Sequence, residues 1–377
     1  MTTNNLIYKR QLAVLIFIMA FTFKVSRLPP LVAEHVKSSG ALLIALYLVF
    51  EIIMFFIIYR IANANGLKDI EDGNGKNIMY KLLMLILLLN FLFKLCLMYA
   101  GTVLFVLELL FENISTEEIA LILVIPIAYL SAKGIQTISR TAEISMWYII
   151  LVLVVNFLFL KASPDFSLNL PILNDEIPVF LKKGSVFFFW FGDFTPFIFL
   201  TLKDSKRNFI KVSLTASVLL ILFVFLLMFA VYGNSARYIS NFIVKVASFN
   251  QFANKLGRLD WTGMIAWLVL AILYLSVYLW AVIEAGSRIF KNRKAALSLG
   301  VIVLTLVIII VGDLNKLIDF ATTEFKYLAV FCNYLVPVIL LFWSMQKRKA
   351  KAISGYENTL DKLGIVAKGE LKNEQDP

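Results

Sequence analysis

Long apolar segments recur along this chain, and they restrict its fold more than any other feature of the sequence. Runs of about 18 or more apolar residues are each long enough to cross roughly 30 Å of hydrocarbon as a helix. Apolar residues make up 60% of the 377 residues. Charged residues make up only 16%, whereas about a quarter is usual in soluble domains. The sequence therefore predicts an all-α polytopic membrane protein surrounded by a lipid bilayer.

The hydropathy pattern predicts about ten membrane spans. They are expected at residues 9–36, 40–62, 78–111, 117–133, 136–161, 184–203, 208–233, 259–290, 294–312 and 322–345. We expect a single transmembrane domain over residues 1–345, followed by a polar cytoplasmic tail over residues 346–377. Lysine and arginine gather in alternate loops, as in "KDSKRNFIK" and "RIFKNRK". The positive-inside bias then places both termini in the cytoplasm.

The first span is interrupted near its middle by residues that a membrane helix normally avoids. The stretch "FTFKVSRLPP", residues 21–30, carries Lys24, Ser26 and Arg27 before the Pro29–Pro30 pair. A proline has no backbone N–H and disrupts the interior of a helix. We therefore expect the prolines to end one half-helix and to begin another.

The sixth span, "GSVFFFWFGDFTPFIFLTLKD", is interrupted in a similar way by Gly192, Asp193, Thr195 and Pro196. Two spans that lie five apart thus break near their midpoints, a pattern typical of transporters built from inverted repeats. A broken helix frees N–H and C=O groups that lipid cannot satisfy, so these groups must line a cavity or hold a ligand. We expect two inverted sets of five spans, residues 9–161 and 184–345, in a LeuT-like arrangement with the site between broken helices 1 and 6.

Signatures of enzymes and of cofactor sites are missing from the sequence. There is one histidine, His35, and the two cysteines both lie inside apolar spans, so we expect no catalytic residues, no metal and no cofactor. A phosphate-binding glycine loop is also missing. The net charge of +11 is carried mostly by short loops, where insertion topology explains it. Nucleic acid is therefore not an expected partner.

Ionisable residues within the spans are the best candidates for function, because each is costly in lipid unless it is paired or faces a cavity. Lys24, Arg27 and Asp193 coincide with the two helix breaks, which favours a functional role for them. We expect Glu51 to form an internal ion pair. Lys94 is equally compatible with an internal pair and with a position near the membrane interface.

We expect Asp193 and either Lys24 or Arg27 to neutralise one another, or to hold the opposite ends of a zwitterionic ligand. The first half-helix ends at Val25 and Ser26 with free carbonyl groups, and the N–H groups that begin the next half-helix suit a carboxylate. The other candidate ligand-binding residues are Gly192 and Phe194 in the second break, and Tyr99 and Tyr274 (with Tyr278 one turn further on) as aromatic walls.

Two stretches of the chain resemble a known family. The segment "AKGIQTISRTAEI", residues 132–144, resembles the start of the fifth span in the permease-like B subunits of bacterial spore germinant receptors. The segment "LNLPILNDEIPVFLKKG", residues 168–184, is similar to the family's outer loop, and Gly192–Asp193 is similar to a Gly-Glu pair in its sixth-span break. A weaker similarity lies in "KLGRLDWTGMIAW", residues 255–267, where Gly257 stands in place of the family's usual glutamate.

This resemblance implies the fold of the amino acid–polyamine–organocation superfamily. It also implies a nutrient-sensing B subunit in the spore inner membrane, which binds an amino acid or a similar small germinant, assembles with A and C subunits, and triggers ion release and germination. Two other functions stay open: a secondary transporter that couples an amino acid to H⁺ or Na⁺, and a structural subunit that has lost ligand binding. In the first break, Lys24 to Arg27 stand where the family has small, glycine-rich residues. These cations either bind the ligand or fill the site themselves.

Overall fold

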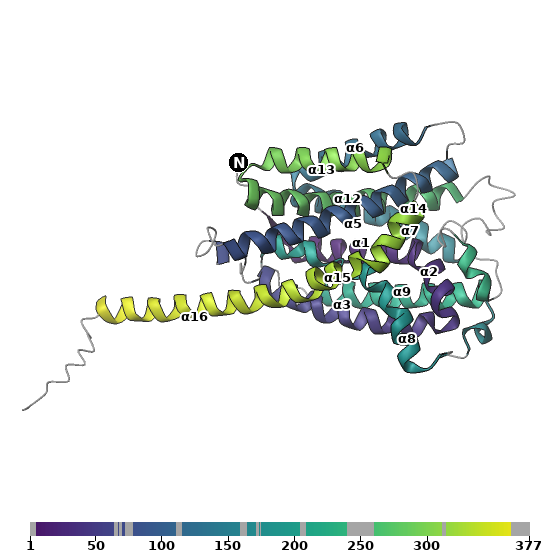
Figure 1. Cartoon of the computed structure of the whole chain (residues 1–377), viewed down its shortest axis with the longest axis horizontal. Coiled ribbons are helices and arrows are strands. Elements are labelled where there is room, and N and C mark those ends of the chain that lie inside the picture. The colour runs from purple at the N-terminus through teal and green to yellow at the C-terminus, as the bar shows by residue number, and fades with distance from the viewer. Residues whose placement is uncertain are drawn as a thin grey trace, which may run out of the picture.

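The computed structural model describes residues 5–63, 67, 70–71, 78–110, 115–158, 164–170, 173, 175–203, 209–239, 260–310 and 314–362. Over these residues the chain is a bundle of helices, with helix α16 projecting from one end (Figure 1). Six helical stretches of the described residues are long and apolar enough to cross a membrane. The protein is an all-α polytopic membrane protein, as the sequence predicted.

Helical elements occur in each segment that was expected to span the membrane, although the sixth is interrupted and ends in a strand. In the first half the elements are β1 (Leu6–Tyr8), α1 (Lys9–Ser26), α2 (Leu28–Val36), α3 (Gly40–Asn63), α5 (Ile78–Leu110), α6 (Thr116–Lys133) and α7 (Ile135–Leu158). In the second half they are η2 (Phe166–Asn169), α8 (Ile177–Gly184), η3 (Ser185–Trp190), η4 (Thr195–Phe199), β2 (Thr201–Lys203), α9 (Phe209–Tyr232), η5 (Gly233–Tyr238), α12 (Asp260–Phe290), α13 (Arg293–Ile310), α14 (Leu314–Thr323), α15 (Phe325–Val330), η6 (Phe331–Leu335) and α16 (Val336–Lys362).

Local sequence signals fix the limits of helix α6. Ser115 precedes the helix, its side-chain oxygen accepts from the N–H of Glu118, and the Glu118 carboxylate accepts from the N–H of Ser115. This reciprocal pair satisfies two N–H groups that the first helical turn leaves open. The helix ends at Gly134, whose φ of +94° a residue with a side chain rarely adopts.

The first expected break lies between α1 and α2. Helix α1 ends at Ser26, Arg27 forms the junction, and α2 starts at Leu28 with Pro29 and Pro30 in its first turn. Prolines are accepted there because the first N–H groups of a helix have no intrahelical partner. The carbonyls of Val25 and Ser26, four residues before the two prolines, consequently lose their helical donors.

The second expected break is more extensive than the first. The sixth span consists of two short 3₁₀ helices, η3 and η4, which residues 191–194 separate. Phe191 is extended, and Gly192 has a φ of +84°. The 3₁₀ geometry was not expected from the sequence. It matches the general use of such helices in short, irregular pieces.

A two-stranded parallel sheet was not expected either. Strand β1, just before α1, pairs with β2, just after η4, so that Leu6 faces Thr201 and Tyr8 faces Lys203. The end of the sixth span is no longer helical, and its backbone groups therefore need other partners. The pairing ties the start of the first broken span to the end of the second.

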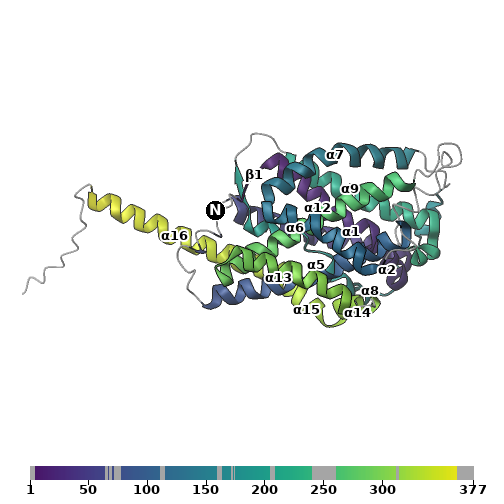
Figure 2. The ribbon, with the colours of Figure 1, turned by 90° about the horizontal axis from the view of Figure 1, so that it is seen from above.

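Helix α12 lies at the centre of the bundle. It packs against α5, α13, α6 and α7, and it is the most buried of the six apolar stretches. Figure 2 shows α12 among its neighbours when the bundle is seen from above. Large apolar side chains remain exposed on outer helices, such as Ile122 and Ile125 on α6 and Trp147 on α7. An exposed apolar surface of this kind suits lipid contact.

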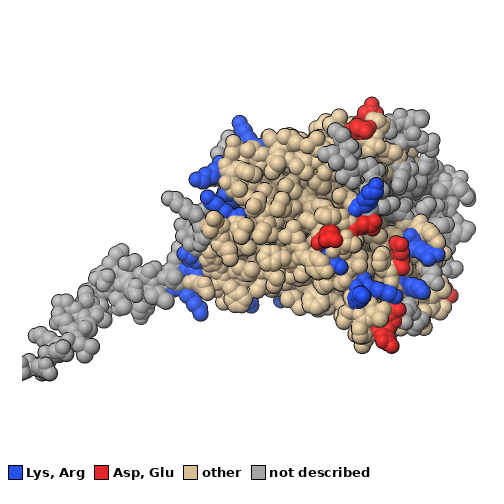
Figure 3. Space-filling view, in the orientation of Figure 1, with Lys and Arg blue, Asp and Glu red and all other residues tan. Residues whose placement is uncertain are grey.

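Charged side chains lie toward the two ends of the bundle. On the face in Figure 3, the end from which α16 projects carries Lys and Arg, whereas the opposite end carries acidic and basic side chains together. Helix α16 continues to Lys362, well beyond residue 345, where the last span was expected to end. The last part of the expected tail, residues 363–377, and the first residues of the 255–267 motif lie outside the described residues. The inverted relation of the two halves stays a prediction.

Replacing Gly192 with alanine is expected to lower the melting temperature of the detergent-solubilised protein. An added Cβ would lie 2.4 Å from the Cβ of Asn333, and the φ of Gly192 strains any L side chain. A strained backbone conformation costs about 1–3 kcal/mol by itself. Gly101→Ala is the matched control, because its Cβ would come no closer than 3.7 Å to the Arg27 side chain. Equal melting temperatures for the two variants would contradict this account of the second break.

Candidate functional site

The two helix breaks meet through a buried ion pair. Lys24, in the last turn of α1, contacts the carboxylate of Asp193, which lies between η3 and η4. Both side chains are almost fully buried, at 1% and 3% exposed. A charge in such a place is stable only when it is paired and hydrogen-bonded. The pair therefore holds the two breaks together.

A second cation and a second carboxylate complete a four-residue charge cluster. Lys94 Nζ, from α5, lies 2.7 Å from Asp193 Oδ1. Glu51 Oε1, from α3, lies 3.0 Å from Lys24 Nζ. Two lysines and two carboxylates are thus joined in the order Lys94–Asp193–Lys24–Glu51, with no net formal charge. We refer to these four residues as the ionic cluster.

Tyrosines of α12 add two hydrogen bonds to the same carboxylate. Tyr274 donates its hydroxyl to Asp193 Oδ1 at 2.6 Å, and Tyr278 donates to the same oxygen at 3.2 Å. The central helix is thereby attached to the second break. Asp193 accepts from two ammonium groups and two hydroxyls, which together offset the cost of burying its charge.

Side chains of the ionic cluster also satisfy backbone groups that the second break leaves open. The Asp193 N–H donates to Glu51 Oε1 at 3.2 Å. The Phe191 carbonyl accepts from Lys94 Nζ at 3.2 Å and from Asn333 Nδ2 at 3.0 Å. Without such partners these groups would be buried and unsatisfied. The cluster therefore replaces part of the hydrogen bonding that a continuous helix would have.

Asn333 belongs to a short π-helical segment, η6, in the last span. Its Oδ1 accepts from Asn90 of α5 at 3.2 Å. The wider turn of a π-helix is rare and is frequently found at functional sites. Here it places an amide beside Gly192, where a glycine leaves room for it.

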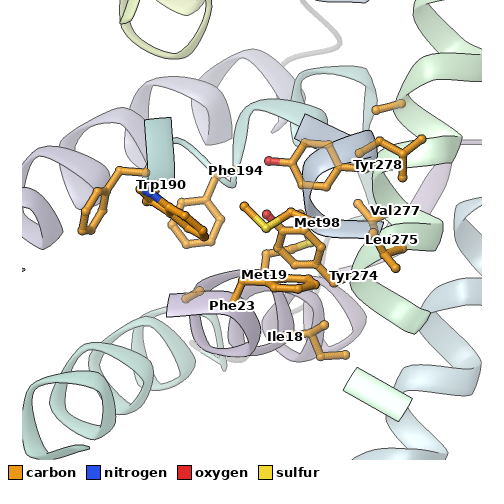
Figure 4. Close-up of a cluster of buried hydrophobic side chains, with 14 of the residues drawn as sticks. Ile18, Met19, Phe23, Met98, Trp190, Phe194, Tyr274, Leu275, Val277 and Tyr278 are labelled. Atoms are coloured by element: carbon orange, nitrogen blue, oxygen red, sulfur yellow. The ribbon is translucent and has the colours of Figure 1, made fainter. Parts of the chain in front are cut away.

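Aromatic rings enclose the ionic cluster. Lys24 Nζ lies 5.3 Å from the centre of the Phe191 ring, which stacks on Tyr47 at 4.6 Å. Phe23 packs edge-on against Tyr274, with ring centres 4.7 Å apart. Figure 4 shows Phe23 and Tyr274, with Trp190 and Phe194 beside them. Cation–π contacts and the low-dielectric walls strengthen the electrostatic interactions inside.

A second group of charges lies near the β1–β2 sheet. Glu284 of α12 accepts from Arg288 at 3.0 Å and from Arg293 at 2.6 Å. Asn5 Nδ2 donates to the same carboxylate at 2.9 Å. Because α16 and the N-terminal strand lie at this end of the bundle, these contacts fasten the N-terminal segment at the end opposite α2 and α14 (Figures 1 and 2).

No group of histidine, cysteine and acidic side chains able to hold a metal ion occurs among the described residues. Cys96 and Cys332 are buried free thiols. What the geometry offers instead is paired, buried charge between two broken helices. Ionisable residues inside a membrane protein are a usual mark of a functional site.

Comparison with known protein families identifies the family of this chain. The family model described as spore germination protein matches residues 6–316. The chain belongs to this family. The match includes all four residues of the ionic cluster, whereas Asn333 lies beyond it. No curated protein sequence matches the chain. This spore germination protein is therefore a germination-related, multi-pass membrane protein of a permease or receptor type.

Four of the sequence-predicted site residues come together in this spore germination protein. Lys24, Gly192 and Asp193 lie where the two breaks meet, and Tyr274 hydrogen-bonds to the Asp193 carboxylate. Of the two cations proposed as the partner of Asp193, the structure selects Lys24. Phe194 is adjacent, and its ring packs against Phe55 of α3 at 5.1 Å.

The remaining predicted residues point elsewhere. Arg27 donates to the Gly101 carbonyl of α5 at 2.5 Å, and Tyr99 donates to the Ala120 carbonyl of α6 at 2.5 Å. Ser26 donates within its own helix to the Thr22 carbonyl at 3.0 Å, and Val25 is fully buried. A ligand-binding role for these residues stays a prediction.

Sequence reasoning left out other members of the site. Glu51 was expected to form an internal pair and does so, but it was not assigned to the site, and Lys94 was left between two positions. Both are ionisable residues inside spans, so the signal was present. Asn90 and Asn333 were missed, because a single amide in an apolar span indicates a buried hydrogen bond and does not name its partner.

Single substitutions in the ionic cluster are expected to destabilise the protein more than a matched double substitution. Lys24→Met or Glu51→Gln each leaves an unbalanced buried charge, and removing one partner of a buried pair costs about 3–5 kcal/mol. The double variant keeps the neutral Lys94–Asp193 pair. Its melting temperature in detergent should therefore fall by less than the sum of the two single decreases.

The half-exposed Lys183–Asp175 pair, at 2.8 Å, provides the control cycle. Lys183→Met and Asp175→Asn should each change stability by about 1 kcal/mol or less, with little coupling. Additive effects of Lys24→Met and Glu51→Gln would contradict the charge balance that we assign to the cluster.

Proposed function

We propose that this spore germination protein is the nutrient-sensing B subunit of a germinant receptor in the spore inner membrane. In this role it binds an amino acid or a similar small germinant between the first and sixth spans, assembles with A and C subunits, and triggers ion release. Membership of the spore germination protein family supports a role in germination. The chemistry of the ionic cluster is the reason for proposing a sensor and not a transporter.

The observation that carries the proposal is the neutral, buried contact between the two helix breaks. A zwitterionic amino acid has the same two charges as the Lys24–Asp193 pair. Its carboxylate can replace Asp193 as the partner of Lys24, and its ammonium can replace Lys24 as the partner of Asp193. Binding would exchange the direct contact for two contacts to the ligand, and the two spans would separate. A ligand that interacts differently with two arrangements shifts the balance between them.

The two lysines also favour sensing over cation-coupled transport. Carboxylates in a membrane protein attract cations, and Asp193 and Glu51 already have lysine ammonium groups as fixed partners. A coupling ion would have to compete with covalently attached cations. The alternative function, a secondary transporter that couples an amino acid to H⁺ or Na⁺, would need these lysines to release the carboxylates during the cycle.

The orientation in the membrane follows from the same proposal. Positive side chains occur at the end from which α16 projects, and β1 lies at that end too (Figures 1 and 3). The positive-inside bias supports a cytoplasmic location for both termini. The opposite end, with α2, α8 and α14, would then face the spore cortex, from which germinants arrive.

The test uses the full chain in proteoliposomes together with its A and C subunits. At a concentration of a hundred times its Kd, an amino acid that binds should stabilise the folded protein by about 2.7 kcal/mol, seen as a higher melting temperature. Asp193→Asn should lower this increase, because it removes the anion that receives the ammonium group at the ionic cluster. Lys183→Met, at a half-exposed position outside the ionic cluster, should keep it.

Uptake of labelled amino acids separates the candidate functions. We expect no accumulation in the proteoliposomes under an inward H⁺ or Na⁺ gradient, although the same amino acid raises the melting temperature. Accumulation would identify a transporter. No change in melting temperature with any of the twenty amino acids would instead identify a structural subunit.

A further inference from the structure

A cavity of about 400 Å³ lies at the end of the bundle opposite α16, away from the ionic cluster. Its walls come from α2, η3 and α14. Figures 1 and 2 both place α2 and α14 toward that end. We call it the outer vestibule. The residues that matter to its chemistry are Glu34, His35, Phe187, Trp190, Ile318 and Asp319. Its volume is typical of a small-molecule site.

The outer vestibule adjoins the first break, because two of its residues also line a crevice beside the break. Trp190 and Ile318 also line a small crevice of about 10 Å³, whose other walls include Arg27, Gly101 and Phe23. Phe23 in turn packs on Tyr274, which hydrogen-bonds to Asp193. Trp190 and Ile318 therefore form the wall between the vestibule and the route to the ionic cluster.

Two carboxylates from different spans give the outer vestibule a negative lining. Glu34 belongs to α2 and Asp319 to α14, and neither forms an ion pair with another residue of the described part of the chain. His35 adds no fixed anion. Its Nδ1 lies 2.9 Å from the Leu31 carbonyl, and its ring packs edge-on against Phe187. Both side chains are exposed, and two carboxylates that line the same cleft give it a negative potential that attracts a cation such as an ammonium group.

Trp190 supplies an independent sign of a ligand. Its side chain is 4% exposed, and its indole N–H has no acceptor within the described residues. Buried donors nearly always have an acceptor, because an unpaired one loses its hydrogen bond to water without replacement. Figure 4 shows the Trp190 side chain and its nitrogen beside the aromatic cluster. An oxygen of a bound molecule in the vestibule would satisfy this donor.

We propose that the outer vestibule is a second binding site, which takes a small amino acid in its zwitterionic form. The ammonium group lies between Glu34 and Asp319, and a carboxylate oxygen accepts from Trp190 Nε1. The site collects the amino acid before Trp190 and Ile318 give way to the first break. Only the ligand class rests on the proposed function, because binding in the vestibule is measured separately.

The experiment is titration calorimetry of the full chain in lipid nanodiscs, with the twenty L-amino acids as probes. For the tightest binder we expect two sites per chain in the wild type. Glu34→Gln combined with Asp319→Asn should weaken one site at least about tenfold, because charge-assisted hydrogen bonds to the ammonium are lost. Trp190→Phe, which keeps the aromatic ring and removes the N–H, should weaken the same site by about tenfold.

Controls separate a lost contact from a lost fold. Glu117→Gln removes an exposed carboxylate in the first turn of α6, away from the vestibule, and should leave both sites unchanged. The N-acetyl derivative of the same amino acid lacks the ammonium charge and should fail to bind in the vestibule. Only variants that keep the wild-type melting temperature are compared. Because Glu34 and Asp319 are exposed, their substitutions should leave the melting temperature unchanged.

The outcomes distinguish the two proposals. If the wild type has one site, and Asp193→Asn removes it while the vestibule variants do not, the second site is overturned and the proposed function stands. If the wild type has one site, and the vestibule variants weaken it while Asp193→Asn does not, the vestibule is established and binding at the ionic cluster is overturned. No amino acid binding to the wild type would overturn both.

Discussion

Asp193 is held by two lysines and two tyrosines, and these contacts determine how the bundle closes around its two broken spans. A lone carboxylate at this depth would be very costly, because neither lipid nor packed side chains replace its hydration. Its partners therefore have to come from other helices. Lys24 comes from α1, Lys94 from α5 and the tyrosines from α12. One charge thus fixes the relative positions of three helices and of the second break.

The backbone imposes the same requirement for a different reason. Each break removes helical hydrogen bonds, and groups left bare inside a membrane need new partners. In the second break, Lys94 and Asn333 serve the Phe191 carbonyl, and Glu51 serves the Asp193 N–H. The charges and the breaks are consequently interdependent: the breaks need polar side chains nearby, and the side chains need one another. Such an arrangement suits a sensor, since a charged ligand can replace some of these partners without leaving the others unsatisfied.

Two regions of the protein have opposite characters. The ionic cluster is neutral, paired and enclosed by aromatic rings. The outer vestibule has unpaired carboxylates and a buried indole donor within the described residues. The first region is satisfied without a ligand, whereas the second gains from one. The proposed germinant-sensing role needs both properties: a stable resting arrangement and a place where the ligand first binds.

The sequence by itself determined the class of fold, most of the helical segments, both breaks, and Lys24 and Asp193 as charged residues at those breaks. Apolar length and the placement of proline and glycine act locally, so these features can be derived from neighbouring residues. Partner choice could not be derived in this way. Arg27 is three residues from Lys24, but the geometry of the helix end turns it to the Gly101 carbonyl and leaves Lys24 for Asp193. Lys94 and Asn333 joined the site, Tyr99 faced α6, and β1 paired with β2, because packing brought together residues that are distant in the sequence. Asn90 and Asn333, for example, are 243 positions apart. The sequence indicates that a charge or amide within a span needs a partner, because burial without one is costly. Which residue becomes the partner depends on the three-dimensional arrangement of the helices.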